Sequence, residues 1–168
     1  MSVLRALLAA LLLAPVLTLQ AATPWRATVT HVTDGDTLWV RPAAGGRPVK
    51  LRLDGIDAPE ICQAHGPAAR RALAQRLQGR QFAIDTRRRD DYGRLVATVY
   101  LEGEDVAGWM VGQGHAWSYR FRRDDGPYRT QQLRAQAAAR GLFADPAALE
   151  PRLFRRRHGT CHVNSGER

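Results

Sequence analysis

Alternating apolar and polar positions dominate the first two thirds of the chain. Residues 26–32, 37–40 and 49–56 have the two-residue period of half-buried strands, and turn-forming Asp, Gly and Pro residues separate them. Two more runs, 81–88 and 94–101, repeat the pattern on either side of a polar connection. The pattern predicts five short strands, of which the first three form a meander.

Helices are predicted after the third strand and after the fifth. Residues 67–77 begin with a proline, which suits a first helical turn, and Gly79 suits the stop. Residues 105–113 and 128–140 are predicted to form two more helices, each followed by a glycine. This order predicts an α+β, mainly β, fold: a five-stranded OB-type Greek-key barrel with about three helices.

The two ends of the chain depart from this pattern. Residues 1–21 carry one charge, at Arg5, and then an apolar run that ends in small residues, which is the layout of a secretory signal peptide. The run is shorter than the roughly 20 residues that span a bilayer, which favours a cleaved signal over a retained membrane anchor. We therefore expect a single domain at 22–150, a basic tail at 151–168, and a secreted or periplasmic protein without membrane attachment.

The chain is strongly basic, with 25 Lys and Arg against 16 Asp and Glu and a formal net charge of +9. This balance indicates a polyanionic partner. Lys50 is the only lysine, and arginine suits bidentate contacts to phosphate. A codon bias toward GC-rich triplets would give the same arginine excess, so charge alone does not identify the partner.

The sequence has two cysteines, Cys62 and Cys161. An even number in an exported protein favours a disulfide bond, and the alternative is two unrelated thiols. A bridge would close a loop of about 100 residues, for which chain-entropy arguments give about 4–5 kcal/mol.

Acids and arginines gather where predicted strands meet turns. The segments are DGDT at 34–37, RLDGIDAPE at 52–60 and DDYGR at 90–94. They contain Asp36, Asp57, Glu60, Arg52 and Arg94. Carboxylates bind hard divalent cations, and guanidinium groups bind phosphate oxygens. Together these groups can hydrolyse a phosphodiester.

Each segment also has a purely structural interpretation. Residues 34–37 and 90–94 are typical of turns. Arg52 lies among apolar neighbours in a strand, and burying it requires an anion. That anion could be a bound phosphate or, in a structural salt bridge, Asp36 or Asp57. The joint occurrence of three such segments in one short chain favours a functional site.

Taken in order, the segments resemble thermonucleases of the staphylococcal (micrococcal) nuclease family. The resemblance runs from Ala27 to Phe143 and includes a GPxA helix start and the run V-x-x-x-M-V-x-x-G-x-A at 106–116. It implies a Ca²⁺-dependent endonuclease that cleaves DNA and RNA with little sequence preference and leaves 3′-phosphate ends. No obligate protein partner is implied, and a monomer suffices.

The resemblance implies roles for individual residues. Glu60 matches a general base, and Arg52 and Arg94 match two phosphate-binding arginines of the catalytic site. The Ca²⁺ ligands would be two carboxylates and one backbone carbonyl, from Asp36, Asp57 and Ala58. Asp34 matches an outer acid near the metal.

Two tyrosines match the nucleotide-binding pocket of the family. They are Tyr92 and Tyr119, with Trp117 as a rival to Tyr119. The chain departs from the family at Ala58, which replaces a threonine, and in a shorter loop after Glu60 that carries Cys62. Alternatives are a non-catalytic OB-fold nucleic-acid-binding module, or phosphodiester chemistry with another metal.

Overall fold

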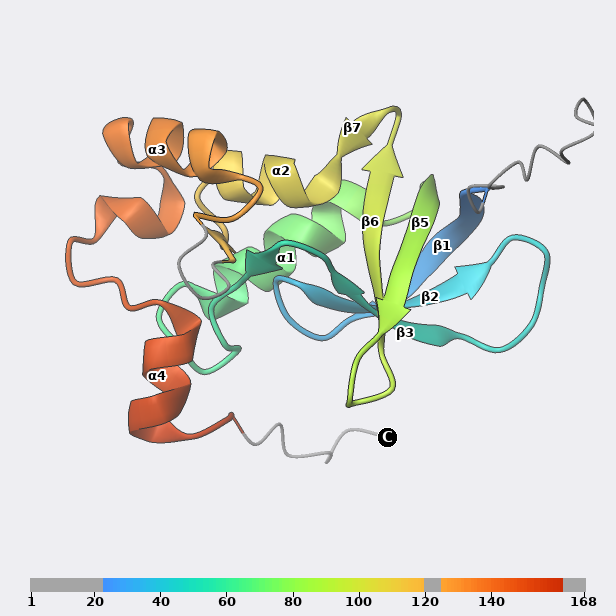
Figure 1. The fold of residues 1–168 in the computed structure, drawn as a ribbon, viewed down its shortest axis with the longest axis horizontal. Coiled ribbons are helices and arrows are strands. Elements are labelled where there is room, and N and C mark those ends of the chain that lie inside the picture. The colour runs from blue at the N-terminus through green and yellow to red at the C-terminus, as the bar shows by residue number, and fades with distance from the viewer. Residues whose placement is uncertain (1–22, 120–124, 162–168) are drawn as a thin grey trace, which may run out of the picture.

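The structure of the protein is a computed structural model that describes residues 23–119 and 125–161 (Figure 1). The predicted signal peptide lies outside these residues, and so does the predicted tail from residue 162 onwards. No helix in the described ranges has the length and apolar character needed to cross a membrane.

Five strands form a closed barrel, on the right in Figure 1. They are β1 (Trp25–Val32), β2 (Thr37–Pro42), β3 (Val49–Leu53), β5 (Gln81–Arg89) and β6 (Leu95–Leu101). Neighbours pair in the order β3-β2-β1-β5-β6, and a parallel pairing of β3 with β6 closes the barrel. This architecture confirms the predicted five-stranded OB-type barrel.

Three two-residue strands extend this frame. β7 (Glu104–Asp105) continues the sheet beyond β6, and β4 (Ile56–Asp57) pairs with β8 (Trp117–Ser118). The β4–β8 pair holds the acid-rich segment after β3 against the chain that follows α2. It therefore fixes part of the candidate site.

The described residues contain four α-helices and one 3₁₀ helix. They are α1 (Gly66–Leu77), α2 (Val106–Gly112), α3 (Arg129–Ala137), η1 (Gly141–Ala144) and α4 (Pro151–His158). The first three α-helices agree with the predicted segments. Sequence analysis does not predict α4, which lies where a basic tail is expected. It begins with Pro151 and ends at His158, and Gly159, whose φ is 76°, follows it.

The core lies between the barrel interior and one face each of α1 and α2. In α1, Ala69, Leu73 and Leu77 recur every four residues and are fully buried. Met110 and Val111 contribute the buried face of α2. Each large apolar side chain buried in this way stabilises the fold by about 1.5–3 kcal/mol, so the barrel and both helices form one packed unit.

Cys62 and Cys161 form a disulfide bond, with their Cα atoms 5.8 Å apart, as predicted. The bond ties the chain just beyond α4 to the loop that follows Glu60. Because 99 residues separate the two cysteines, the bond closes a long loop in the unfolded chain.

Replacing both Cys62 and Cys161 by serine is expected to lower the free energy of unfolding by about 2–5 kcal/mol. The reason is that the unfolded chain regains the conformational freedom that the bridge removes. Urea unfolding of the oxidised protein, the reduced protein and the double variant measures the difference. A double variant as stable as the oxidised protein would contradict a stabilising bridge.

Candidate active site

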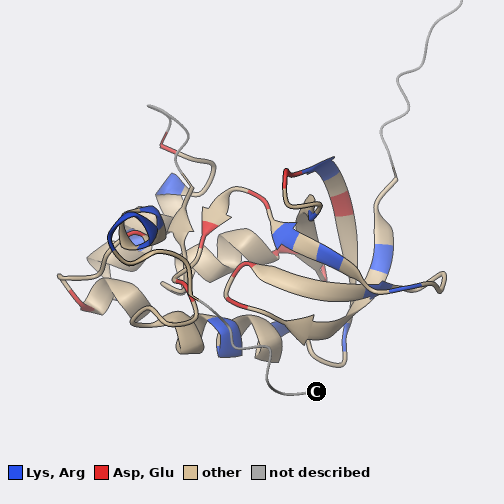
Figure 2. Ribbon diagram, turned by 90° about the horizontal axis from the view of Figure 1, so that it is seen from below, with Lys and Arg blue, Asp and Glu red and all other residues tan. Residues whose placement is uncertain are grey.

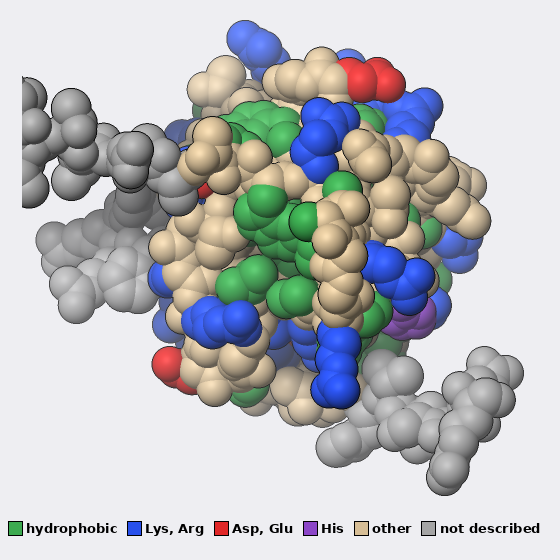
Figure 3. All heavy atoms as spheres, turned by 90° about the vertical axis from the view of Figure 1, so that its right-hand side faces the viewer, with side chains coloured by type: hydrophobic (Ala, Val, Ile, Leu, Met, Phe, Trp, Pro, Cys, Tyr) green, Lys and Arg blue, Asp and Glu red, His purple; other side chains and the backbone are tan. Residues whose placement is uncertain are grey.

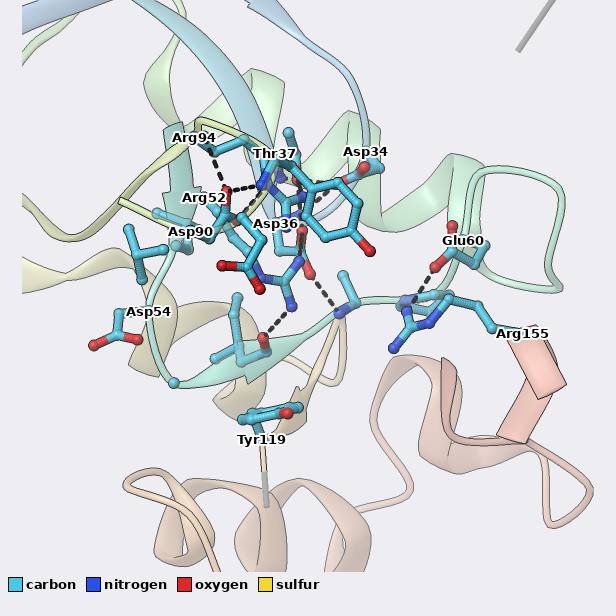
Figure 4. A pocket seen from close by; sticks show the side chains of 18 of the residues that line it. Asp34, Asp36, Thr37, Arg52, Asp54, Glu60, Asp90, Arg94, Tyr119 and Arg155 are labelled. Atoms are coloured by element: carbon cyan, nitrogen blue, oxygen red, sulfur yellow. Dashed lines mark hydrogen bonds and ion pairs between the residues drawn. The ribbon is translucent and has the colours of Figure 1, made fainter. Parts of the chain in front are cut away.

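The predicted site residues surround one open cavity of about 540 Å³ (Figure 4). Eight of the nine line it directly or lie on its rim: Asp34, Asp36, Arg52, Ala58, Glu60, Tyr92, Arg94 and Tyr119. Asp57 lies behind this lining with only 4% of its surface exposed. Residues from four separate parts of the sequence therefore meet at one end of the barrel.

Arg52 is the centre of this cluster. The β2–β3 register places Arg52 opposite Thr37, next to the DGDT turn. Its Nη1 donates to Asp36 Oδ1 at 2.6 Å, and its Nη2 donates to Asp57 Oδ1 at 3.3 Å and to the Ile56 carbonyl at 3.0 Å. Burial disfavours the charged guanidinium, but the two carboxylates outweigh it and raise the pKa of Arg52. Arg52 therefore pairs with both acids and still faces the cavity.

Asp36 is anchored from both sides. Its Oδ1 accepts a hydrogen bond from Thr37 Oγ1 at 2.8 Å, and its Oδ2 accepts one from the Ala58 amide at 3.1 Å. The close approach of these segments depends on Gly35, because a Cβ there would lie 2.7 Å from Ala58 Cβ and 2.8 Å from Ala69 Cβ. The glycine of DGDT thus lets the metal-ligand candidates pack against α1.

Asp34 shapes the turn that carries Asp36. Its Oδ1 accepts from the amides of Asp36 at 2.9 Å and Thr37 at 2.7 Å. Burial, together with the neighbouring Asp36 charge, raises the pKa of Asp34 to about 7. The hydrogen bonds that the Asp34 carboxylate accepts thus lie within its own turn.

Arg94 approaches the cavity from the opposite hairpin. Its Nε donates to Asp90 Oδ2 at 2.7 Å, and its Nη1 lies 3.4 Å from Thr37 Oγ1. The ring of Tyr92 covers this guanidinium at 5.2 Å and is 85% exposed. The hairpin thus presents a cation and an aromatic face at the rim of the cavity.

Tyr119 lies on the far side of the acid cluster (Figure 4) and is 40% exposed. Its amide donates to the Gly55 carbonyl at 2.8 Å. Trp117 is buried, and its ring packs edge-on against Phe143. Tyr119 therefore lines the cavity, whereas Trp117 lies in the protein interior.

Glu60 sits at the start of the loop that leads into α1. Its amide donates to Gln63 Oε1 at 3.2 Å. Gly66 lies directly against its carbonyl, and a Cβ at Gly66 would overlap that oxygen. The backbone of Glu60 is thus fixed by the first residue of α1.

Arg155 of α4 is a site residue that sequence analysis misses. Its Nη1 donates to Glu60 Oε1 at 2.6 Å, and its Nη2 donates to Asp57 Oδ2 at 3.0 Å. Burial raises the pKa of Asp57 even though the Arg155 and Arg52 guanidinium groups oppose the rise. The predicted disulfide between Cys62 and Cys161 could have indicated this contact, because it brings the basic run before Cys161 close to Glu60.

Oxygen atoms make up the donor set available to a metal ion. Across residues 23–119 and 125–161, no three His, Cys, Asp or Glu residues form a ready-made metal cage. Asp36, Asp57 and the Ala58 carbonyl offer hard oxygen donors, which suit Ca²⁺. Three carboxylates of the cluster, those of Asp36, Asp57 and Glu60, form ion pairs with two guanidinium groups. The guanidinium groups are those of Arg52 and Arg155. The cluster therefore fits an added cation in both charge and donor type.

Comparisons with known proteins agree with this geometry. A family model described as "Staphylococcal nuclease homologue" matches residues 50–142. The micrococcal nuclease of Shigella flexneri is 32% identical over 167 residues, which cover 93% of this chain and 94% of that protein. Protein ParB of Escherichia coli is 39% identical over 142 residues (78% and 79%). An uncharacterized endonuclease of Haemophilus influenzae is 36% identical over 128 residues (76% and 71%).

Gly66→Ala is expected to lower the free energy of unfolding by about 1–3 kcal/mol, because the new Cβ displaces the carbonyl of Glu60. Gly112→Ala is the matched control, since its Cβ would meet only Gln131 Cβ at 4.0 Å. We expect the control to be neutral or slightly stabilising. Urea unfolding compares the two, and equal stabilities would contradict a tight approach at Glu60.

Proposed function

Because the chain belongs to the staphylococcal nuclease family, whose nuclease activity is phosphodiester hydrolysis, we propose that it is an exported, Ca²⁺-dependent endonuclease. In this proposal it acts as a monomer on DNA and RNA with little sequence preference and leaves 3′-phosphate ends. The observation that carries the proposal is the meeting of Arg52, Arg94 and Glu60 around one cavity.

Arg52 and Arg94 suit the binding of a phosphodiester. Both line the cavity, and their guanidinium groups are fixed by Asp36 and Asp90 on one edge. A guanidinium group held in this way can neutralise the charge that develops on the phosphoryl oxygens. It does so without having to change its own position. Arg94 also lies at the rim, where it can assist departure of the 5′-oxygen.

Glu60 supplies the general base in this proposal. Its carboxylate takes a proton from water as the water oxygen bonds to phosphorus and the bond from phosphorus to the 5′-oxygen breaks. The departing 5′-oxygen takes up a proton from solvent, so the products are a 3′-phosphate and a 5′-hydroxyl. The disulfide and Gly66 hold the loop of Glu60 in place, which keeps the base at a fixed position beside the arginines.

Asp36 and Asp57 would hold the cation, with the Ala58 carbonyl as a third ligand. When bound, Ca²⁺ adds positive charge against the phosphoryl oxygens. Asp36 is held by Arg52, Thr37 and the Ala58 amide, so its carboxylate is oriented in advance. Asp34 contributes by holding the turn that carries Asp36.

The surroundings support a nucleic acid substrate without base-specific contacts. Tyr92 and Tyr119 offer exposed rings on two sides of the cavity, where nucleotide bases and sugars can pack. The right-hand side of the barrel in Figure 1, seen in Figure 3, carries a hydrophobic patch flanked by Lys and Arg, and the chain has a formal net charge of +9. This positive charge attracts the phosphate backbone of a nucleic acid. The disulfide bond supports an oxidising, exported location.

Glu60→Gln is expected to reduce DNA cleavage in Ca²⁺ by about 10²–10⁴-fold while DNA binding and folding are kept, because the amide cannot accept the proton. Cleavage assays in Ca²⁺ and in EDTA measure the loss, with Glu102→Gln as the control on an exposed acid outside the cavity. Normal turnover of Glu60→Gln would remove the base assignment. Intact DNA bound by the unaltered protein under every metal would favour the binding module.

Arg52→Lys is expected to lower turnover by on the order of 10²–10³-fold, because an ammonium group cannot contact Asp36, Asp57 and a phosphate together. Arg41→Lys on the exposed side of β2 is the control for the same change of chemistry. Steady-state kinetics with a short oligonucleotide measure both variants. Near-normal rates for Arg52→Lys would assign Arg52 to structure alone.

A further inference from the structure

Arg155 pairs with two acids of the candidate site, Asp57 and Glu60. Both of its terminal nitrogens contact the Asp57 carboxylate, at 3.3 and 3.0 Å, and Nη1 also donates to Glu60 at 2.6 Å. Figure 4 shows the side chain reaching from α4 toward Glu60. The guanidinium thus joins the proposed metal ligand Asp57 to the proposed base Glu60.

The position of Arg155 is built into the fold at both ends of α4. Beyond the helix, Cys161 is bonded to Cys62, two residues after Glu60. Before the helix, the buried Gln63 side chain donates to the Leu149 carbonyl at 2.7 Å and accepts from the Glu60 amide at 3.2 Å. These two links hold α4 against the loop that carries Glu60. They keep Arg155 next to the acids.

The guanidinium of Arg155 and a divalent cation would draw on the same carboxylate, that of Asp57. Each N–H of Arg155 directed at Asp57 or Glu60 occupies a lone pair that an oxygen ligand would offer to the ion. Two positive charges on one carboxylate would also repel each other. Binding of one therefore weakens binding of the other.

We propose that Arg155, held in place by its ion pair with Glu60, is a tethered counter-cation that competes with the divalent cation for Asp57 and thereby sets the metal affinity of the site. The inference rests on the proposed function, because it takes Asp57 as a metal ligand and Glu60 as the base beside it. A ligand that must displace an intramolecular competitor loses affinity in proportion to the population of the competing state. Because the competitor is part of the chain, the effect does not depend on protein concentration.

The test is calorimetric titration of Ca²⁺ into the metal-free protein, without nucleic acid. Arg155→Gln is expected to bind Ca²⁺ about tenfold more tightly than the unaltered protein, since the ion no longer displaces a paired guanidinium. Arg155→Lys, with a single-point charge, is expected to lie between the two. Arg156→Gln is the matched control, because Arg156 is an exposed neighbour on α4 whose loss removes the same net charge.

Thermal unfolding in EDTA gives a second measure and reports folding. Arg155→Gln is expected to unfold at a lower temperature than Arg156→Gln, because Asp57 stays buried with one fewer counter-charge. Adding Ca²⁺ is expected to raise the unfolding temperature of Arg155→Gln by more than that of Arg156→Gln.

Equal Ca²⁺ affinities of Arg155→Gln and Arg156→Gln would overturn the competition, because only net charge would then matter. Weaker binding by Arg155→Gln would overturn it too and make Arg155 an organiser of the site. Absence of Ca²⁺ binding in every protein would remove both the competition and the Ca²⁺ requirement, and DNA cleavage in EDTA would show whether hydrolysis survives. Tighter binding without any cleavage would keep the competition and reject the nuclease proposal.

Discussion

The ion pairs of Arg52 are the interactions on which the candidate site depends. One guanidinium holds Asp36 from the turn before β2 and Asp57 from β4, and it also binds the Ile56 carbonyl. The turn before β2 and strand β4 are thereby fixed to β3. Buried carboxylates are expensive without partners, and in the described part of the chain removing Arg52 would leave Asp36 without an ion pair and Asp57 with Arg155 alone. The same guanidinium orders the site and lines the cavity where an anion would bind.

The arrangement around Arg52 was largely predictable because local sequence dictates it. Period-two alternation defines the five barrel strands, and a strand arginine between acids demands an anionic partner. Structural and functional interpretations of Arg52 turn out to be compatible, since it pairs with both acids and still faces the cavity. The disulfide was predictable from the even number of cysteines and the expected export of the chain, because neither depends on a local pattern.

The contribution of α4 was not predictable in the same way. The segment 151–158 is short and rich in arginine, and its apolar side chains Leu153 and Phe154 are adjacent rather than repeated at helical spacing. Figure 2 shows this segment almost end-on as a strongly basic helix. Its contact with Glu60 spans 95 residues, so no local pattern reports it. Tyr119, the residue favoured over Trp117 for the pocket, lines the cavity, and Trp117 is buried. Local sequence does not report this burial, because the ring of Trp117 packs against Phe143 of η1.

The bond between Cys62 and Cys161 also imposes an order of events on the making of this protein. A chain that ends before Cys161 already contains the barrel, Arg52 and the acids of the site, but it lacks the covalent link between the end of α4 and the loop of Glu60. In the reduced protein, noncovalent contacts remain, namely the ion pairs of Arg155 and the hydrogen bond from Gln63 to the Leu149 carbonyl. The bond thus couples the placement of one arginine beside the acids to the oxidation state of two cysteines.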